Sequence, residues 1–391
     1  MSWGGVKVDD QRIRFVLRAC TGKERISDLC REFYISRQRG YYWLARFKEG
    51  DEIASLKERS RRPHHSPLKI AEAIEHRIVA ERKRRPDWGA RKIQVLLARE
   101  DLVVPACTIH RILQRNQLIH PHHQHPPALK RFQREHPNQL WQMDFKGLPS
   151  NLSHGWAPLS VLDDCSRFVV LLRALEDRKT GAEVRRTLEE AFERYGVPDA
   201  MLMDHGTPWW NGQHVCGWTR LSIWLMKQGV SLHLAAVRHP QTQGKVERFH
   251  RTLEEALHER GFPPQREQWA GWLEEFREEY NQVRPHEALN MATPGSCWRP
   301  SPRAYQPNPP AWDYPPGEPL LQVRSSGQVM VEHQEYTISQ ALAGETIQLK
   351  RLSEDRLLAF YRSTCVREIN LRKRQSYPVY FSREQRVFEH D

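Results

Sequence analysis

Trp141-Gln142-Met143-Asp144-Phe145 is an apolar run with one carboxylate inside it, and the part of the chain that it opens decides the fold. The run lies in the first of three strand-like stretches, 140–145, 159–163 and 168–172, which turn residues separate and which predict three antiparallel strands. Predicted helices then alternate with strands, at 181–195, 200–203, 218–227, 231–236, 245–260 and 268–282. This alternation predicts an α/β layer fold, in which helices cover both faces of a mixed sheet.

Upstream, the apolar residues of 11–48 recur at helical spacing, which predicts three short helices. Ser36 is a candidate N-cap for the third helix. Arg37, Gln38 and Arg39 therefore fall at its start, where a helix-turn-helix places the side chains that read bases. A plain three-helix core would explain the apolar pattern equally well, but the basic residues favour DNA binding.

A second helical unit is predicted next, with helices at 70–84, 90–99 and 105–114. Its third helix carries Thr108, His110 and Arg111, which are placed to face a groove in DNA. Two successive basic units of three helices predict a DNA site that extends beyond one helical turn.

The remaining N-terminal stretches have no apolar period and are predicted as linkers. Arg61 and Arg62 in the first linker suit a phosphate track or a minor groove. The second linker is rich in histidine and proline; consecutive loop histidines without another ligand cluster usually form a polar tether, so a metal site is the less favoured interpretation.

The C-terminal part has a dense run of prolines followed by six short strand-like runs about ten residues apart, which predicts a spacer and then a small β-barrel. No structure is readable in the last residues. The predicted organisation is a first helix-turn-helix domain (8–58), a linker (59–68), a second helix-turn-helix-like domain (69–119), a linker (120–137), the α/β core (138–299), a proline-rich linker (300–319), the β-barrel (320–372) and a tail (373–391).

The formal net charge of +12 is unevenly distributed. Residues 1–140 hold 29 Lys+Arg against 16 Asp+Glu, and the rest hold 31 against 32, which predicts that the first third meets a polyanion. Seven scattered cysteines without a C-x-x-C pair indicate neither a disulfide framework nor a zinc ribbon. Because no apolar run approaches the roughly 20 residues that span a bilayer, we expect a soluble cytoplasmic protein, without a membrane partner and located on chromosomal DNA when bound.

Three carboxylates stand where strand ends and a helix start would bring them together: Asp144, Asp204 and Glu247. Hard oxygen ligands without histidine or cysteine suit Mg²⁺ or Mn²⁺. Two such ions stabilise both the attacking and the leaving oxygens of an in-line phosphoryl displacement. Taken singly, each acid is weak evidence, because a strand-end aspartate is more often a turn residue or a cap, and Glu254 and Glu255 offer the same chemistry near Glu247.

Other residues near these acids have two interpretations each. Asp163 and Asp164 are rival ligands, but they read more naturally as the turn into Ser166-Arg167 with a salt-bridge role. Lys245 and Arg248 flank Glu247, where DNA contact is favoured over a merely solvated face, and His239 and Gln243 are weaker candidates for the same surface. The tryptophans Trp209, Trp210 and Trp218 suit base stacking, although buried packing is the commoner fate of tryptophan.

Several motifs closely resemble, in order, the core motifs of bacterial insertion-sequence transposases with a retroviral-integrase-like domain. They are Trp141-Gln142-Met143-Asp144-Phe145, Val161-Leu162-Asp163-Asp164-Cys165-Ser166-Arg167, Asp204-His205-Gly206, the stretch from His239 to Arg248 and the stretch from Tyr280 to Leu289, with Ser60-Arg61-Arg62-Pro63 upstream. The resemblance covers most of the chain. It implies an RNase H-like catalytic core, an Asp-Asp-Glu triad at Asp144, Asp204 and Glu247, a divalent metal and transposon-end DNA as substrate.

One departure from that family is visible. The 42 residues from 205 to 246 make the gap between Asp204 and Glu247 longer than usual, and we expect the extra length in the Trp-rich segment 209–218, as an extended loop. If that segment entered the sheet instead, the assignment of Asp204 would weaken.

The sequence is compatible with three functions. The leading hypothesis is a DDE transposase that joins DNA ends to double-stranded target DNA, working as a dimer or larger assembly such as a tetramer. A DNA-binding regulator derived from a transposase and a metal-dependent nuclease are the alternatives. The intact acidic trio argues against the first alternative, and the paired DNA-reading modules argue against the second.

Overall fold

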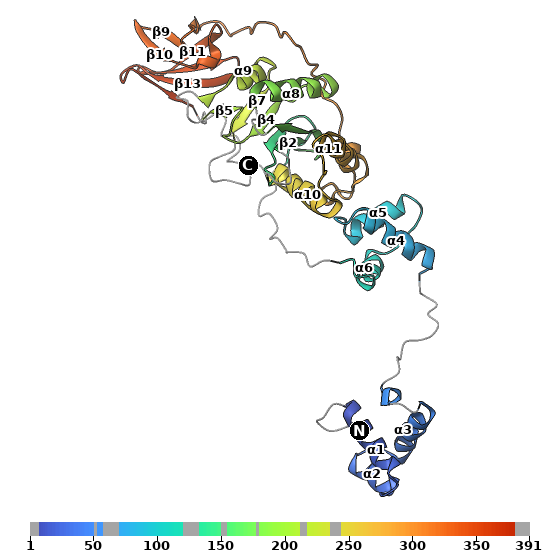
Figure 1. The fold of residues 1–391 in the computed structure, drawn as a ribbon. Coiled ribbons are helices and arrows are strands. Elements are labelled where there is room, and N and C mark those ends of the chain that lie inside the picture. The colour runs from blue at the N-terminus through green and yellow to red at the C-terminus, as the bar shows by residue number, and fades with distance from the viewer. Residues whose placement is uncertain are drawn as a thin grey trace. The chain divides into compact units, whose positions relative to one another are not determined.

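The protein is described here by a computed structural model, which places residues 8–50, 53–57, 70–119, 133–149, 155–176, 180–211, 217–234 and 244–379 (Figure 1). The chain divides into two compact units, Met1–Ala71 and Glu72–Asp391. Among the described residues, no helix combines the length and the apolar character needed to cross a membrane.

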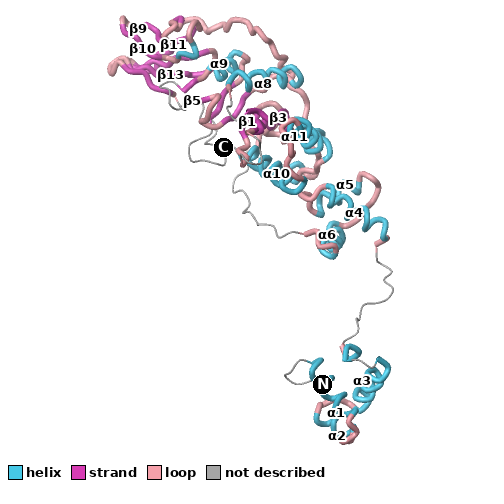
Figure 2. Tube along the Cα trace, in the orientation of Figure 1, coloured by secondary structure: helices cyan, strands magenta, loops and turns pink. Residues whose placement is uncertain are grey.

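The described residues of the first unit form helices joined by short loops (Figure 2). Its elements are α1 (Val8–Cys20), α2 (Ile26–Glu32), α3 (Arg37–Gly50) and the short 3-10 helix η1 (Ile53–Leu56). The three helices predicted from apolar spacing are confirmed. The Arg39 amide donates to Ser36 Oγ at 3.2 Å, which confirms Ser36 as the N-cap of α3. A Cβ on Gly40 would lie 2.6 Å from Cys30 Sγ, so a glycine here lets α3 pack closely on α2.

The second unit begins with three more helices, α4 (Glu72–Arg84), α5 (Ala90–Ala98) and α6 (Ala106–Arg115), which confirms the second predicted trio. Their apolar faces meet around Ile78, Trp88, Ile93 and Ile109, each with no exposed surface. The periodicity of these buried residues explains why the segment folds as helices.

A five-stranded mixed sheet forms the centre of the second unit. Its strands are β1 (Trp141–Phe145), β2 (Trp156–Asp163), β3 (Val169–Glu176), β4 (Ala200–Met203) and β7 (Ser231–Leu234), in the order β3-β2-β1-β4-β7. The first three strands pair antiparallel as predicted, and β4 pairs parallel with both β1 and β7.

Helices cover both faces of this sheet, which confirms the predicted layer fold (Figure 1). One face packs against α8 (Gly181–Tyr195) and α9 (Arg220–Lys227), and the other against α10 (Gly244–Arg260) and α11 (Gln268–Glu278). The short helical turns η3 (Glu279–Val283), η4 (Glu287–Leu289) and η5 (Pro294–Cys297) follow α11. Within this segment Asn281 binds β3, because its side chain donates to the Val169 carbonyl at 2.9 Å and accepts from the Val169 amide at 2.8 Å.

The described residues of the Trp-rich segment lie outside the central sheet. Its described residues form a separate two-stranded ribbon, β5 (Trp210–Asn211) with β6 (Gly217–Trp218). In place of the extended loop that was predicted before the next helix, the described residues form this small two-stranded ribbon. The central strands that position Asp204 are uninterrupted.

The C-terminal part corrects one prediction. Its strands are β8 (Leu320–Gln322), β9 (Gln328–Val331), β10 (Gln334–Thr337), β11 (Thr346–Ser353), β12 (Arg356–Tyr361), β13 (Thr364–Asn370) and β14 (Gln375–Pro378), with the 3-10 helix η6 (Gln340–Leu342) between β10 and β11. The six predicted strands are present, and β14 lies in the stretch expected to be an unstructured tail.

These strands do not close into the predicted barrel. They form an open antiparallel sheet in the order β14-β13-β12-β11-β8 and a separate β9-β10 hairpin. The hairpin packs against the sheet, since Val329 and Tyr336 share a buried apolar cluster with Ile347, and Ser376 Oγ donates to the Thr337 carbonyl at 2.6 Å. Evenly spaced strands are common to barrels and open sheets, and only the pairing of the edge strands distinguishes the two.

Candidate functional site

Asp144 and Asp204 lie at the same end of two neighbouring parallel strands. Trp141 pairs with Met201 and Gln142 with Leu202, and the same register continued by two residues sets Asp144 opposite Asp204. Side chains alternate between the faces of a sheet. Trp141 and Met201 belong to the core under α8 and α9, so Gln142, Asp144 and Asp204 belong to the opposite face, which α10 covers.

Asp204 is oriented by hydrogen bonds from the segment that follows it. Its Oδ1 accepts from the Gly206 amide at 2.9 Å and from Trp209 Nε1 at 2.8 Å. Trp209 is buried and stacks on Phe145 with ring centroids 5.4 Å apart. Trp209 is thus a packing and positioning residue, which is the commoner of the two interpretations given from the sequence; Trp210 is also buried.

Asp144 has a neighbour that the sequence did not single out. His250 on α10 places Nδ1 3.7 Å from Asp144 Oδ2, and its Nε2 lies 3.0 Å from Ser160 Oγ. Burial, and to a lesser extent Lys146, lowers the pKa of His250 to about 3, so the imidazole is neutral and leaves the charge of Asp144 in place. The sequence did contain a signal for His250. It lies three residues after Glu247, and this spacing places both residues on the same face of the predicted helix.

Glu247 lies in the first turn of α10 and is exposed. The start of this helix is fixed to β1, because Gln142 Oε1 accepts from the Val246 amide at 3.2 Å. The alternative acid Glu254 instead forms an ion pair with Lys146 at 2.7 Å. Within the described parts of the chain, no three acidic, histidine or cysteine side chains are close enough together to hold a metal ion. The structure therefore sets the two aspartates in register and places Glu247 on the helix that covers their face, without gathering all three carboxylates.

The rival acids are occupied by the turn after β2. Asp163 accepts from the Asn138 amide at 2.7 Å and from Ser166 Oγ at 2.6 Å, and burial raises its pKa. Asp164 accepts from Gln142 Nε2 at 2.8 Å and forms an ion pair with Lys245 at 2.5 Å. These contacts agree with the turn and salt-bridge roles.

Lys245, a predicted DNA contact, is thus half-buried with its ammonium group on Asp164. Burial, opposed by Asp164, lowers its pKa to about 8. The pair connects the start of α10 to the turn after β2. A contact between Lys245 and DNA stays a prediction.

The other predicted DNA contacts that the structure describes lie on α3, α6 and α10. Arg37, Gln38 and Arg39 are exposed in the first turn of α3, and Arg111 is exposed on α6. Thr108 is half-buried on α6, and Arg248 is exposed on α10. Arg61 and Arg62, like His239 and Gln243, lie outside the described residues.

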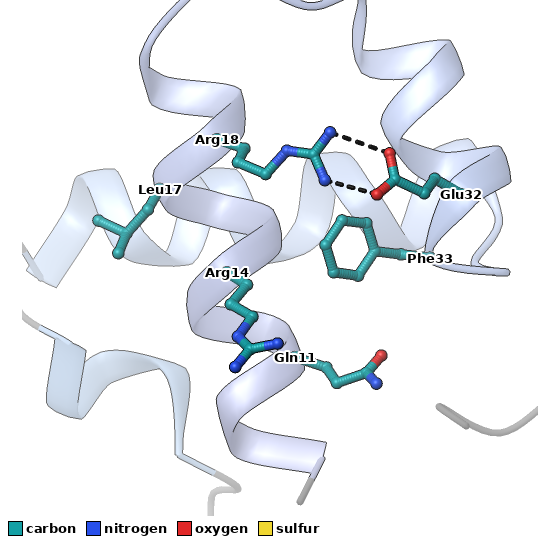
Figure 3. Close-up of a pocket in the computed structure, with 6 residues that line it drawn as sticks. All are labelled: Gln11, Arg14, Leu17, Arg18, Glu32 and Phe33. Atoms are coloured by element: carbon teal, nitrogen blue, oxygen red, sulfur yellow. Dashed lines mark hydrogen bonds and ion pairs between the residues drawn. The ribbon is translucent and has the colours of Figure 1, made fainter. Parts of the chain in front are cut away.

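The first unit contains a hollow between α1 and the end of α2. It is lined by Gln11, Arg14, Leu17, Arg18, Glu32 and Phe33, which come from α1 and the end of α2 (Figure 3). Arg18 binds both Glu24 and Glu32 there, each at 2.5 Å. These bonds brace α1 against α2 and its preceding loop.

Separate stretches of the chain match known protein families. Residues 134–240 and 228–294 match two families described as integrase core domain. Residues 11–64 match a helix-turn-helix domain family, and residues 39–113 match a homeodomain-like domain family. The central part of the chain is therefore similar to integrase core domains, and the part before it is similar to helix-turn-helix and homeodomain-like domains.

Individual relatives come from insertion elements and retroviruses. The uncharacterized 31.7 kDa protein of insertion element IS407 from Burkholderia multivorans is 27% identical over 243 residues, which cover 59% of this chain and 80% of that protein. The Gag-Pol polyprotein of baboon endogenous virus is 27% identical over 176 residues, and the match spans 43% of this chain but only 10% of the polyprotein. A cryo-EM structure of a simian T-cell lymphotropic virus intasome with a PP2A regulatory subunit aligns with a TM-score of 0.36 at 15% identity, over 74% of this chain and 98% of that chain.

Proposed function

We propose that this protein is a DDE transposase, which binds the ends of a mobile DNA element and catalyses metal-dependent strand cleavage and strand transfer. The observation that carries the proposal is the register of β1 and β4. It sets Asp144 and Asp204 side by side at the ends of parallel strands, on the face covered by the helix that bears Glu247. Sites in α/β sheets form at this end of the strands.

The carboxylates suit a divalent cation. Asp204 is oriented through Oδ1 by Gly206 and Trp209, and the neighbouring His250 is neutral and does not balance the charge of Asp144. Oxygen ligands of this kind favour Mg²⁺ or Mn²⁺. Asp144, Asp204 and Glu247 would hold two such ions, which supply Lewis-acid stabilisation of the oxygens at the reacting phosphate.

The remaining residues position these acids and bring DNA to them. Gln142 and the Lys245–Asp164 pair fix the start of α10, and thereby Glu247, against β1 and the turn after β2. The exposed residues at the start of α3 and on α6 read the element end. Because two element ends must be held together for joining, the active form is a dimer or a tetramer on DNA.

A joining assay tests the proposal. The full-length protein is incubated with Mg²⁺, a target plasmid and labelled duplexes taken from the DNA that flanks its coding sequence. Wild type should yield joined products, and Asp144→Asn should yield none while still binding DNA. Asp313→Asn, which neutralises an exposed aspartate in the proline-rich segment, is the matched control and should join normally. Cleavage without joining would replace the proposal by a nuclease, and binding with neither reaction would replace it by a DNA-binding regulator.

A further inference from the structure

Buried ion pairs attach the helices α4–α6 to the core. Asp87, in the turn between α4 and α5, forms ion pairs with Arg284 and, at 3.1 Å, with Arg260, and its side chain has no exposed surface. Arg85 in the same turn forms an ion pair with Glu279 at 3.0 Å. These five residues define a seam between two parts of one compact unit.

The charges of the seam hold α4–α6 in one orientation. Sliding or turning of these helices would separate buried charges from their partners, and an unpaired buried charge is strongly destabilising. The end of α5 is fixed as well, because Arg99 Nη1 donates to the Val283 carbonyl at 3.0 Å. Since contacts lie near both ends of α5, there is no single pivot about which the helices could turn.

The turn that forms the seam is also fixed to α6, the helix that carries the predicted DNA contacts Thr108 and Arg111. Arg82 is buried, and its Nη1 donates to the carbonyl of Trp88 in this turn at 2.6 Å. The Nε of the same side chain donates at 3.1 Å to the carbonyl of Leu118, which closely follows α6. A tilt of α6 would therefore disturb the seam.

On the core side, the seam lies on the helix that bears Glu247. Arg260 is the last residue of α10, and Glu247 is in its first turn. The rise of the helix between these two residues is about 20 Å. Gln142 fixes the start of the helix to β1 through the Val246 amide. A movement of α4–α6 relative to Glu247 would therefore have to break the seam, bend α10 or detach its start.

We propose that Asp87, Arg260 and Arg284 determine which phosphodiester is cut relative to the DNA sequence that α6 reads. The seam and α10 hold α6 and Glu247 at a fixed separation, so the protein sets the distance along the DNA from the recognised sequence to the cut. These residues act by positioning and do not touch the reacting phosphate. The inference rests on the proposed function, because it requires that α6 binds the element end and that Glu247 lies at the reacting phosphate.

The segment of DNA that α6 reads is located first. Hydroxyl-radical footprints of the full-length protein, without metal, compare wild type with Arg111→Ala on duplexes taken from the DNA that flanks the coding sequence. The nucleotides whose protection is lost in Arg111→Ala define the α6 segment. Unchanged protection throughout would overturn the proposal, because α6 would not be a reading helix.

Photo-crosslinking then measures the separation. p-Benzoylphenylalanine replaces Arg248, which is exposed next to Glu247, and the crosslinked nucleotides are mapped without metal. Two base pairs inserted between the α6 segment and these nucleotides move the DNA beyond them by about 7 Å and turn it by about 70°. With the seam intact, the crosslinks should stay at one distance from the α6 segment. Crosslinks that instead follow the displaced nucleotides would overturn the proposal.

Variants of the seam should lose this fixed distance. Asp87→Asn should spread the crosslinks over several nucleotides, whereas Asp101→Asn, which neutralises an exposed aspartate between α5 and α6, should keep the narrow wild-type pattern. Glu279→Gln removes the partner of Arg85 and is the second variant, for use if Asp87→Asn does not fold. A narrow, unshifted pattern in a folded seam variant would overturn the proposal. The insertion experiment on the wild-type seam tests the proposal independently of both variants.

Cleavage in Mg²⁺ separates positioning from a merely structural role. The wild-type cut should keep its distance from the α6 segment after the insertion, and Asp87→Asn should cut at several positions. A slower reaction of Asp87→Asn at one sharp position would indicate a merely structural role and overturn the proposal.

The same experiments distinguish this inference from the proposed function. If the crosslinks keep a fixed distance but wild type neither cuts nor joins DNA, the proposed function fails and the fixed separation stands. If wild type joins DNA while the crosslinks follow the displaced nucleotides, the fixed separation fails and the proposed function stands.

Discussion

Neutralising Asp87 should loosen the helix-turn-helix unit from the integrase core. Asp87→Asn keeps the shape of the side chain but leaves Arg284 and Arg260 without the charge between them. The Asp87 side chain is 0% exposed, that of Arg284 is 7% exposed and that of Arg260 is 19% exposed, so water cannot fully replace the lost partner.

The expected cost follows from these contacts. Removing one partner of a buried ion pair typically costs about 3–5 kcal/mol, because the remaining charge stays buried. Arg260 keeps Glu279 at 2.8 Å, whereas Arg284 has Asp87 as its ion-pair partner among the described residues. We therefore expect Asp87→Asn to cost about 3 kcal/mol, at the lower end of this range.

Hydrogen exchange of the full-length protein measures this loss. Peptides from α5 should exchange about 150-fold faster in Asp87→Asn, since each 1.4 kcal/mol is a factor of ten. Peptides from α8 serve as an internal control and should be unchanged. Asp101→Asn is the matched control. Asp101 is exposed in the same helical unit and has a positive φ of 60°, which asparagine also tolerates. This substitution should change the free energy of opening of α5 by less than about 0.5 kcal/mol.

The effect should also depend on pH. Burial alone would raise the pKa of Asp87, but Arg284 and Arg260 outweigh it and lower that pKa below the value in the unfolded chain. Because the pKa of Asp87 is lower in the folded protein, its ionised form stabilises the fold above the unfolded pKa of about 3.9. This stabilisation is lost as the pH falls through the folded-state pKa. The difference between wild type and Asp87→Asn in the free energy of opening of α5 should therefore persist at neutral pH and shrink only in acid below about pH 4.

Two results would refute this reasoning. A loss under about 1 kcal/mol at pH 7 would mean that the ion pairs of Asp87 do not attach α5 to the rest of the unit, because it is well below the range for a broken buried pair. Equal acceleration in α5 and α8 would mean that the substitution weakens the whole unit and not the attachment of its first three helices.

One other prediction concerns the site. Trp209→Phe keeps an aromatic ring next to Phe145 but removes the donor to Asp204 Oδ1, so strand joining should fall about 10–100-fold; joining at the wild-type rate would contradict a positioning role.

The sequence by itself determined most elements and their order. The three helices of 11–48, the strand around Asp144 and the helix that bears Glu247 all follow from apolar periods of 3.6 or 2 residues, with Ser36 as a cap. Such patterns depend on neighbours within one or two turns of the chain, so they are readable without a tertiary structure. The order of motifs carried the resemblance to integrase-like transposases in the same way.

The tertiary structure decided which distant groups meet. Asp87 and Arg284 are 197 positions apart, and nothing local in either segment marks the other as its partner. The contact of His250 with Asp144 depends on which face of β1 lies under α10, and the open C-terminal sheet depends on whether its edge strands pair. A contact of this kind is set by the packing of whole elements and by the desolvation of the charges between them, and these are properties of the folded chain rather than of any stretch of its sequence.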